Sequence, residues 1–313
     1  MALTLAQANA TSREQLAAGV GQVFVYNSFI LDRLAFENIE GTAYKYFTEA
    51  ALPGAEFRAV NSSYAESTGS YTSATEGLTI LGGDADVDRF LQLTRSDLID
   101  QRATQVEMKA RAIAHKFNDT FINGNTGVDA NSFNGLKTRL TGGQVLSTAT
   151  NGAAINTDSG TRQTFFDNLD ALIAQVPNCD VLLTNRQILS KYRSAARRET
   201  MAQTTVDGLG RTVDVYNGIP IVDVGNKADG TQIIPQTETQ GTASGTSGSI
   251  YAVHFGTGAP EQGVVGLTNG GVQVFDLGQL ETKPVYRTRI EWFTGLALFG
   301  AQPAARLQGV LAS

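Results

Sequence analysis

Three aspartates spaced two residues apart, Asp84, Asp86 and Asp88, are the part of this sequence that most resembles a metal site. Carboxylates at this spacing open the calcium loop of EF-hand proteins, which also needs a glycine at its sixth position and a carboxylate at its twelfth. Those two positions hold Arg89 and Arg95 here. We therefore interpret the run as a solvated acidic turn and not as a calcium site.

The candidate nucleophiles and bases do not form a catalytic set. A nucleophile elbow reads Gly-x-Ser-x-Gly after a strand, whereas residues 241–245 read Gly-Thr-Ala-Ser-Gly, with the serine misplaced. We expect His254 to be a hydrogen-bonded strand residue, His115 to lie on a helix surface, and Cys179 to be a small buried hydrophobe. One cysteine excludes a disulfide or a Cys-based zinc site within the chain. The sequence predicts no catalytic, cofactor or metal-binding residue.

Anion-binding motifs are incomplete as well. Residues 208–210, Gly-Leu-Gly, lack the third glycine of the dinucleotide fingerprint, and no Gly-Lys-Ser/Thr occurs. Arg193, Arg197 and Arg198 cluster on a short predicted helix, and we interpret them as a solvated face or as ion-pair partners. A net charge of −6 and a pI of about 5.0 disfavour tight nucleic-acid binding but allow a loose coat around it.

The composition is that of a globular protein, with 313 residues of which 42% are hydrophobic and 17% charged. The length allows one large or two modest domains. The N-terminus has no basic segment before an apolar run, and no apolar stretch reaches the roughly 20 residues that a membrane span needs. We expect a soluble protein made in a reducing compartment.

A long helix is the element that the sequence predicts most strongly, over residues 94–123. Thr94 can cap its start and Gly124 can end it. Its apolar residues recur at spacings of three and four, while the opposite face is charged, so the pattern favours a helix lying across a sheet. The stripe is formed by Ile99, Ala103, Val106, Ala110, Ile113, Phe117 and Phe121.

Two N-terminal segments are predicted to pack outside a core of their own, and the second also has little apolar content. Residues 1–40 are Ala-rich and interrupted by glycines, which is typical of an arm that packs on something else. In residues 41–93 two strand-like runs, 55–60 and 77–81, flank a polar centre, which predicts a long hairpin. A two-stranded ribbon is marginal alone in water, so we expect it to be disordered or to lie on a neighbouring subunit.

The rest of the chain alternates helices and strands and then ends in strands. Residues 161–176 and 186–199 are predicted helices around a buried strand at 180–184, which indicates an α/β or α+β unit. The final long strand, 283–293, alternates apolar residues on one face with charged residues on the other.

This order of elements resembles the Hong Kong 97-type major capsid protein of tailed double-stranded DNA bacteriophages. Three local sequences support the resemblance: Phe121-Ile-Asn-Gly-Asn125 followed by Phe133-Asn-Gly-Leu136, then Tyr216-Asn-Gly-Ile-Pro-Ile221, then Arg287-Thr-Arg-Ile-Glu-Trp-Phe293 with Gln302-Pro303 and Leu307-Gln-Gly-Val310. Each is weak alone, and their order over nearly the whole chain carries the argument.

The resemblance implies an α+β fold of the Hong Kong 97 capsid type, divided into four regions. They are an N-terminal arm (1–40), an extended β-hairpin loop (41–93), a peripheral domain with a long spine helix and long strands (94–164 and 271–313), and an axial α/β domain (165–270). We expect the assembly contacts to involve Phe57, Tyr64 and Tyr71 in the loop and Arg287, Arg289 and Glu291 on the last long strand. We expect some of the latter to pair with arm and loop carboxylates of neighbouring subunits, the alternative being a solvated strand face.

The resemblance also implies a function and partners. Many copies would form hexamers and pentamers in an icosahedral shell around double-stranded DNA, in a virion assembled in the bacterial cytoplasm. The partners would be a portal, a separate scaffolding protein, cement or decoration proteins, and weakly contacted DNA, without a membrane. Some members of the family are cross-linked through a loop lysine, but no lysine occurs between Lys45 and Lys109, so we expect non-covalent contacts. The alternatives are an encapsulin-type compartment shell and, more remotely, an unrelated hydrolase or binding domain.

Overall fold

The computed structural model describes residues 20, 23, 28–95, 101–147, 152–206, 210–239, 247–258, 263–300 and 302–312. The helical elements are α3 (Phe29–Arg33), α4 (Arg89–Arg95), α5 (Gln101–Asn123), α6 (Leu136–Arg139), η1 (Gly142–Gln144), α7 (Ser159–Gln175) and α8 (Arg186–Arg198). The strands are β1 (Phe36–Asn38), β2 (Ala43–Ala51), β3 (Ser70–Gly77), β4 (Thr79–Asp88), β5 (Val145–Ser147), β6 (Ala153–Ala154), β7 (Val181–Thr184), β8 (Gln203–Val206), β9 (Thr212–Tyr216), β10 (Ile219–Asp223), β11 (Ser247–Val253), β12 (Gly263–Gln279), β13 (Val285–Phe299) and β14 (Ala304–Leu311).

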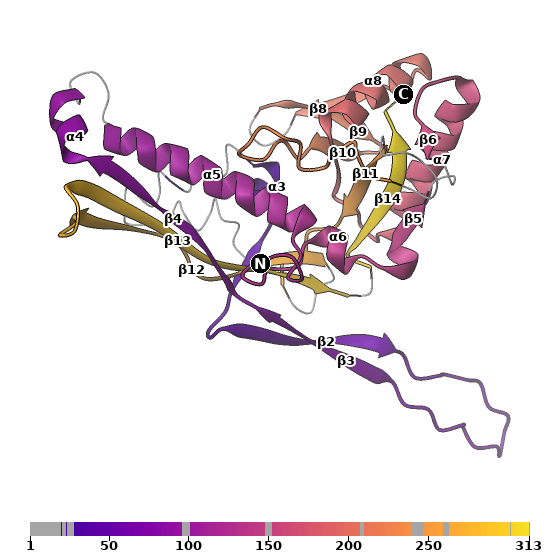
Figure 1. The fold of residues 1–313 in the computed structure, drawn as a ribbon. Coiled ribbons are helices and arrows are strands. Elements are labelled where there is room, and N and C mark those ends of the chain that lie inside the picture. The colour runs from indigo at the N-terminus through magenta and orange to yellow at the C-terminus, as the bar shows by residue number, and fades with distance from the viewer. Residues whose placement is uncertain are drawn as a thin grey trace.

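The strands form three sheets (Figure 1). A four-stranded sheet has the order β1-β12-β13-β4, with α5 along one of its faces. An eight-stranded sheet has the order β5-β14-β11-β7-β10-β9-β8, with β6 beside β14. Strands β2 and β3 form a separate hairpin that projects away from the rest of the molecule. Among the described residues, no helix is both long and apolar enough to cross a membrane.

The predicted long helix is present as α5, but it begins later than expected. Thr94 does not cap it: this residue lies inside the separate helix α4, where its hydroxyl donates to the Phe90 carbonyl at 2.7 Å. Ile99 lies outside the described residues. The end of the helix at Asn123 is as predicted, because a side chain on Gly124 would collide with the Phe133 and Thr120 carbonyls.

The apolar stripe of α5 packs on the four-stranded sheet, as predicted. Its members Val106, Ala110, Ile113, Phe117 and Phe121 are buried, whereas Ala103, also predicted in the stripe, is exposed. The ring of Phe117 lies 4.9 Å from that of Trp292 on β13 and 6.1 Å from that of Phe36 on β1. The indole N–H of Trp292 donates to the Thr268 hydroxyl at 3.0 Å, so this large buried ring has its one polar atom satisfied.

The eight-stranded sheet carries α7 and α8 on one face. Helix α8 starts where the sequence predicts and α7 starts two residues earlier than predicted, and Asp158 and Asn185 accept from backbone N–H groups of the first turns. Successive residues of β7 face opposite ways. Leu182 packs with α7 and α8, whereas Val181 and Leu183 join the cluster that contains the α5 stripe. The two sheets therefore share one continuous core.

Three segments lie elsewhere than the sequence analysis placed them. Residues 28–39, expected in the arm, enter the chain's own core, and the Ser28 hydroxyl donates to Asn118 on α5 at 2.6 Å. Residues 79–88, expected in the loop, form β4 and pair along β13. Strand β14, expected with the spine helix, pairs with β11 in the eight-stranded sheet. The strand predicted at 55–60 is irregular chain. The limits of the four regions otherwise stay a prediction.

Candidate assembly surfaces

The root of the β2–β3 hairpin is an aromatic cluster. The ring of Tyr46 lies 4.7 Å from that of Phe299 at the end of β13, and the ring of Tyr44 lies 6.1 Å from both. Tyr46 is buried, and burial followed by the charge of Glu76 raises the pKa of its hydroxyl. The hairpin is therefore joined to the four-stranded sheet by side-chain packing, because its two strands pair, within the described part of the chain, only with each other.

A charged pair fixes the same root from the side. The guanidinium of Arg139 donates to both carboxylate oxygens of Glu76 on β3, and its Nη2 also donates to the Leu296 carbonyl at 3.0 Å. The two side chains keep only 15% and 18% of their exposure. A bidentate pair with this geometry fixes direction as well as distance, so the hairpin has a defined angle to the sheet.

The tip of the hairpin, residues 52–69, has local order without a core. The Ser67 hydroxyl donates to the Gly54 carbonyl at 3.0 Å, and the guanidinium of Arg58 lies 5.2 Å from the centre of the Tyr64 ring. The apolar side chains of the tip are nevertheless exposed, as are two on the adjoining strands β2 and β3: Leu52, Phe57, Val60 and Tyr64 in the tip, with Phe47 and Tyr71 on the strands. Exposed apolar residues gathered in one projecting element mark an interaction site.

The charged face of β13 pairs within the chain. Strand β4 lies beside β13 with Asp86 opposite Arg287 and Asp84 opposite Arg289. Arg289 donates to both oxygens of Asp84 at 2.7 and 3.0 Å, and Arg287 binds Asp86 at 2.7 and 2.6 Å. These hydrogen bonds lower the pKa of both aspartates. Glu291 continues the row, 3.9 Å from Arg289.

This charged row corrects two expectations. The aspartates of the supposed acidic turn lie on a strand, and the described residues contain no cluster able to hold a metal ion. The arginines of β13 are not merely solvated, because they pair with aspartates of β4 in the same chain. They therefore do not need carboxylates of a neighbouring subunit as counter-charges. The sequence did contain the signal: three aspartates and two arginines each repeat every second residue, the period of a strand.

A second exposed apolar surface, which the sequence analysis missed, lies at the end of the four-stranded sheet. We call it the sheet-end patch, and it consists of Phe90, Leu91, Leu93, Phe275 and Leu277. Helix α4 supplies the first three residues and β12 the other two. Figure 1 shows both elements at the end of the molecule opposite the hairpin tip.

The residues weighed for catalysis have structural partners. The Nδ1 atom of His254 lies 2.7 Å from Asp180, which also accepts from the Phe255 N–H. Burial raises the pKa of the Cys179 thiol to about 11, as suits a packed hydrophobe more than a nucleophile. Arg193 binds Asp214 at 2.7 Å, as expected for an ion-pair partner.

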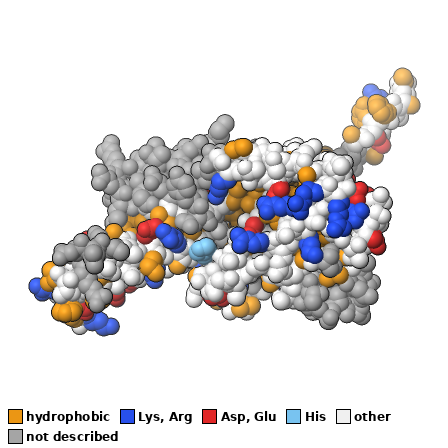
Figure 2. Space-filling model, turned by 90° about the horizontal axis from the view of Figure 1, so that it is seen from above, with side chains coloured by type: hydrophobic (Ala, Val, Ile, Leu, Met, Phe, Trp, Pro, Cys, Tyr) orange, Lys and Arg blue, Asp and Glu red, His pale blue; other side chains and the backbone are white. Residues whose placement is uncertain are grey.

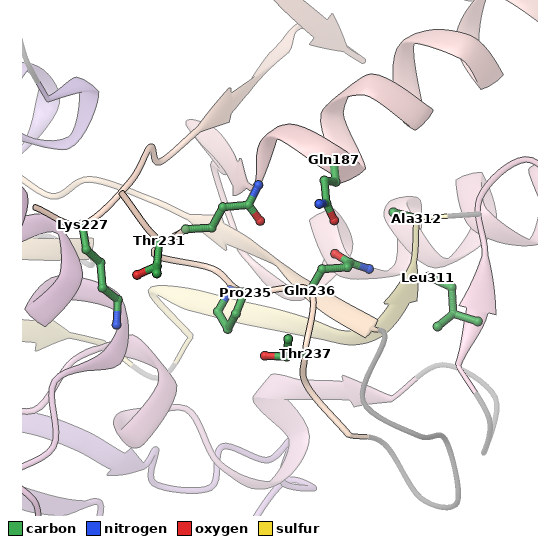
Figure 3. A pocket seen from close by; sticks show the side chains of 9 residues that line it. Gln187, Lys227, Thr231, Pro235, Gln236, Thr237, Leu311 and Ala312 are labelled. Atoms are coloured by element: carbon green, nitrogen blue, oxygen red, sulfur yellow. The ribbon is translucent and has the colours of Figure 1, made fainter. Parts of the chain in front are cut away.

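An open cleft of about 810 Å³ lies beside the end of β14 and the start of α8 (Figure 3). Its labelled side chains combine amide and hydroxyl groups with the apolar Pro235, Leu311 and Ala312, and Lys227 lies at one end. The ammonium of Lys227 also lies 3.3 Å from Asp119. Among the described residues that line it there is no acidic side chain, histidine or cysteine, and the groups present there are hydrogen-bonding amides and hydroxyls beside one ammonium.

A buried carboxylate joins α6 to the eight-stranded sheet. Glu238 accepts from the Ser249 hydroxyl, from Arg306 at 2.8 Å and from Lys137 on α6 at 2.9 Å. Burial by itself would raise the pKa of Glu238, but the hydrogen bond from Ser249 and the charges of Arg306 and Lys137 hold it below its usual value.

Acid should therefore weaken the fold through Glu238. Because its pKa is lower in the folded chain than the 4.5 of a free side chain, its contribution is complete above about pH 4.5 and disappears as the pH falls through the folded pKa. Glu238→Gln should lower the free energy of unfolding by about 2–4 kcal/mol at pH 7 and flatten the acid slope. Urea unfolding from pH 7 to pH 3 measures both effects. The tip variant Glu66→Gln should keep the wild-type profile, and an acid slope unchanged in Glu238→Gln would contradict the assignment.

Two family models match parts of the chain. Residues 22–168 match the model of the major capsid protein GP7. Residues 141–279 match the model of the type 2A encapsulin shell protein, SrpI-like. No curated protein sequence matches the chain.

Solved structures show the fold over most of the chain's length. The holo-SrpI encapsulin complex from Synechococcus elongatus PCC 7942 is 17% identical, with a TM-score of 0.67 over 91% of this chain and 88% of that one. The capsid of a native GTA particle is 15% identical, with a TM-score of 0.63 over 91% and 90%. Microbacterium phage Oxtober96 is 14% identical, with a TM-score of 0.59 over 90% of each chain.

The structural similarities and the GP7 match agree with the geometry of the projecting hairpin described above. A projecting hairpin with exposed aromatic residues is what a shell subunit needs to contact its neighbours, and the elements occur in the order that the sequence predicts. The chain therefore has the Hong Kong 97-type fold that these phage, GTA and encapsulin shell subunits share, and residues 22–168 match the major capsid protein GP7 model.

Proposed function

We propose that the chain forms, as hexamers and pentamers, the icosahedral virion shell of a tailed phage and encloses its double-stranded DNA. Assembly takes place in the cytoplasm of the bacterial host, with a portal and a separate scaffolding protein, and decoration proteins bind the finished shell. The protein acts by assembly and not by catalysis. The observation that carries the proposal is the hairpin, whose root is fixed in the core and whose aromatic side chains Phe57, Tyr64 and Tyr71 are exposed.

Burial of the tip on a neighbouring subunit would offset part of the cost of ordering it. Fixing a backbone costs about 1–2 kcal/mol per residue, and a fully buried aromatic side chain returns about 1.5–3 kcal/mol. Phe57, Tyr64 and Tyr71 are the contacts we propose. We propose a lesser role in assembly for Arg287, Arg289 and Glu291, because their charges are already matched within the chain. Only the exposed edge of this row of charged side chains can contact a neighbouring subunit.

An encapsulin-type shell that holds cargo is the second candidate, favoured by the match of residues 141–279 and by the SrpI structure. The role as a phage capsid protein is favoured by the GP7 match, which covers α5 and the hairpin, and by the similarity to several phage and GTA capsid structures. The contents of native particles separate the two. After nuclease treatment of the outside, a phage shell should release double-stranded DNA, whereas a compartment shell should release protein cargo and no genome.

Removing the hairpin tip should abolish shells and leave the subunit folded. Ala51 pairs with Ser70, so residues 53–68 can be replaced by Asn-Gly without breaking the β2–β3 ladder. We expect an unchanged melting midpoint and a monomer in place of shells, measured by calorimetry and negative-stain microscopy. Asn61→Gly is the matched control, because Asn61 has a left-handed backbone (φ 69°) that glycine adopts freely. Normal shells from the tipless chain would refute the role of the tip.

A further inference from the structure

Helix α8 concentrates positive charge in an acidic protein. It contains five cations and no acidic residue, whereas the whole chain has a net charge of −6. The helix is amphipathic, and its apolar face packs on the eight-stranded sheet. The outer face has no apolar side chain and consists of Arg186, Gln187, Ser190, Lys191, Arg193, Ser194, Arg197 and Arg198.

Only part of this charge is neutralised. Arg193 binds Asp214 at 2.7 Å, and Arg186 lies 3.8 Å from Asp223. Arg197 donates to the carbonyl of Arg193 and not to a carboxylate. In the part of the chain that the structure describes, Lys191, Arg197 and Arg198 have no acidic partner.

A groove lies beside the cationic face of α8. It has a volume of about 660 Å³ between α8 and β9–β10, and its lining combines Arg186, Arg193 and Arg211 with Asp214 and Asp223, so it adds little net charge. Figure 2 shows Lys and Arg side chains gathered on the right-hand half of the upper face, over the part of the molecule that carries α8. Several cations are thus gathered near α8, with some acidic side chains among them.

We propose that the outer face of α8 contacts the phosphate backbone of the enclosed nucleic acid, which requires this face to point into the shell. The inference rests on the proposed function and adds the surface and the orientation. A polyanion fits better than a folded protein, because the core of a protein interface is rich in aromatic and apolar residues and this face has none. Arginine is suited to phosphate, since its planar fork donates two parallel hydrogen bonds. About three uncompensated charges per subunit make each contact weak, and the shell repeats it in every copy.

The salt dependence of DNA binding tests the surface. The α8 variant Lys191→Gln/Arg197→Gln/Arg198→Gln is compared with the control Lys45→Gln/Arg58→Gln/Lys283→Gln, which removes the same charge at exposed positions elsewhere. Fluorescence anisotropy with a 30-base-pair duplex is recorded over a salt series. Each lost phosphate contact should reduce the slope of log K against log salt by about 0.9, so we expect the α8 variant to lose about 2–3 and the control less than about 1. Equal losses in the two variants would overturn the proposal.

Orientation and assembly give independent checks. A cryo-electron microscopy map of closed wild-type shells should place α8 on the inner surface, and α8 on the outer surface would overturn the inference. If the α8 variant stops assembling while its DNA affinity is unchanged, the face is a contact between copies and the inference is again wrong. Native particles that hold protein cargo in place of DNA would instead refute the proposed function, so the two failures are distinguishable.

Discussion

Phe117→Ala should destabilise the folded chain by about 3–5 kcal/mol, the range for removing a fully buried aromatic ring from a core. Phe117 has no exposed surface and contacts rings from β1 and β13 as well as Phe121 and Phe133. Its loss opens a cavity between α5 and the four-stranded sheet that rigid neighbours cannot fill. Urea unfolding of the unassembled chain, monitored by the fluorescence of Trp292 beside it, measures the loss.

The exposed Phe90 on α4 is the matched control for Phe117. Phe90→Ala should change the free energy of unfolding by less than about 0.5 kcal/mol, because its side chain is mostly in water. It lies in the sheet-end patch, so the same variant shows separately whether that patch matters for shells. Equal unfolding midpoints for Phe117→Ala and the wild type would mean that α5 does not pack on the sheet as described.

Arg139→Gln should have the second large effect, on assembly more than on stability. Breaking a well-buried pair costs about 3–5 kcal/mol, and the residual exposure of Arg139 and Glu76 reduces our expectation to about 2–4 kcal/mol. Because the pair sets the angle of the hairpin, we expect irregular aggregates or monomers in place of closed shells. Negative-stain microscopy and urea unfolding on the same preparation separate the two effects.

A double-mutant cycle makes this test specific. Glu76→Gln should cost about as much as Arg139→Gln, and the double variant should cost less than their sum, because each single variant leaves one charge unpaired. The control is Arg111→Gln, which breaks an exposed pair with Glu107 on α5 whose side chains are 52% and 48% exposed. Such surface pairs contribute about 0–1 kcal/mol. Regular shells and additive costs would show that the root pair does not orient the hairpin.

Local patterns predicted the helices well. The stripe of α5 repeats every three to four residues, and Asp158 and Asn185 mark the starts of α7 and α8 with side chains that satisfy nearby N–H groups. These features depend on neighbours within one or two turns, so they can be read from the sequence directly. The exposed aromatics of the hairpin tip were predictable for the same reason, because their surroundings contain little apolar sequence.

Long-range pairing could not be read in the same way. Asp84 and Arg289 are 205 residues apart, and no local pattern selects one strand as the partner of another. The same limit explains why β4 was assigned to the loop and β14 to the wrong sheet. Residues 28–39 were assigned to an arm because their burial comes from Asn118 and β12, far along the chain.

The fixed root of the hairpin has a geometric consequence. Phe57 follows Tyr46 by eleven residues, and extended chain rises about 3.3 Å per residue, so the tip acts about 35 Å from its fulcrum. A tilt of about 5° at the ring cluster moves Phe57 by about 3 Å, more than the 0.5–1 Å gap that apolar contact tolerates. The hairpin therefore acts as a lever. Very small rotations of the hairpin at Arg139 let subunits follow changes in shell curvature. By the same geometry, an error of a few degrees at Arg139 moves the aromatic tip off its contact site on the neighbouring subunit.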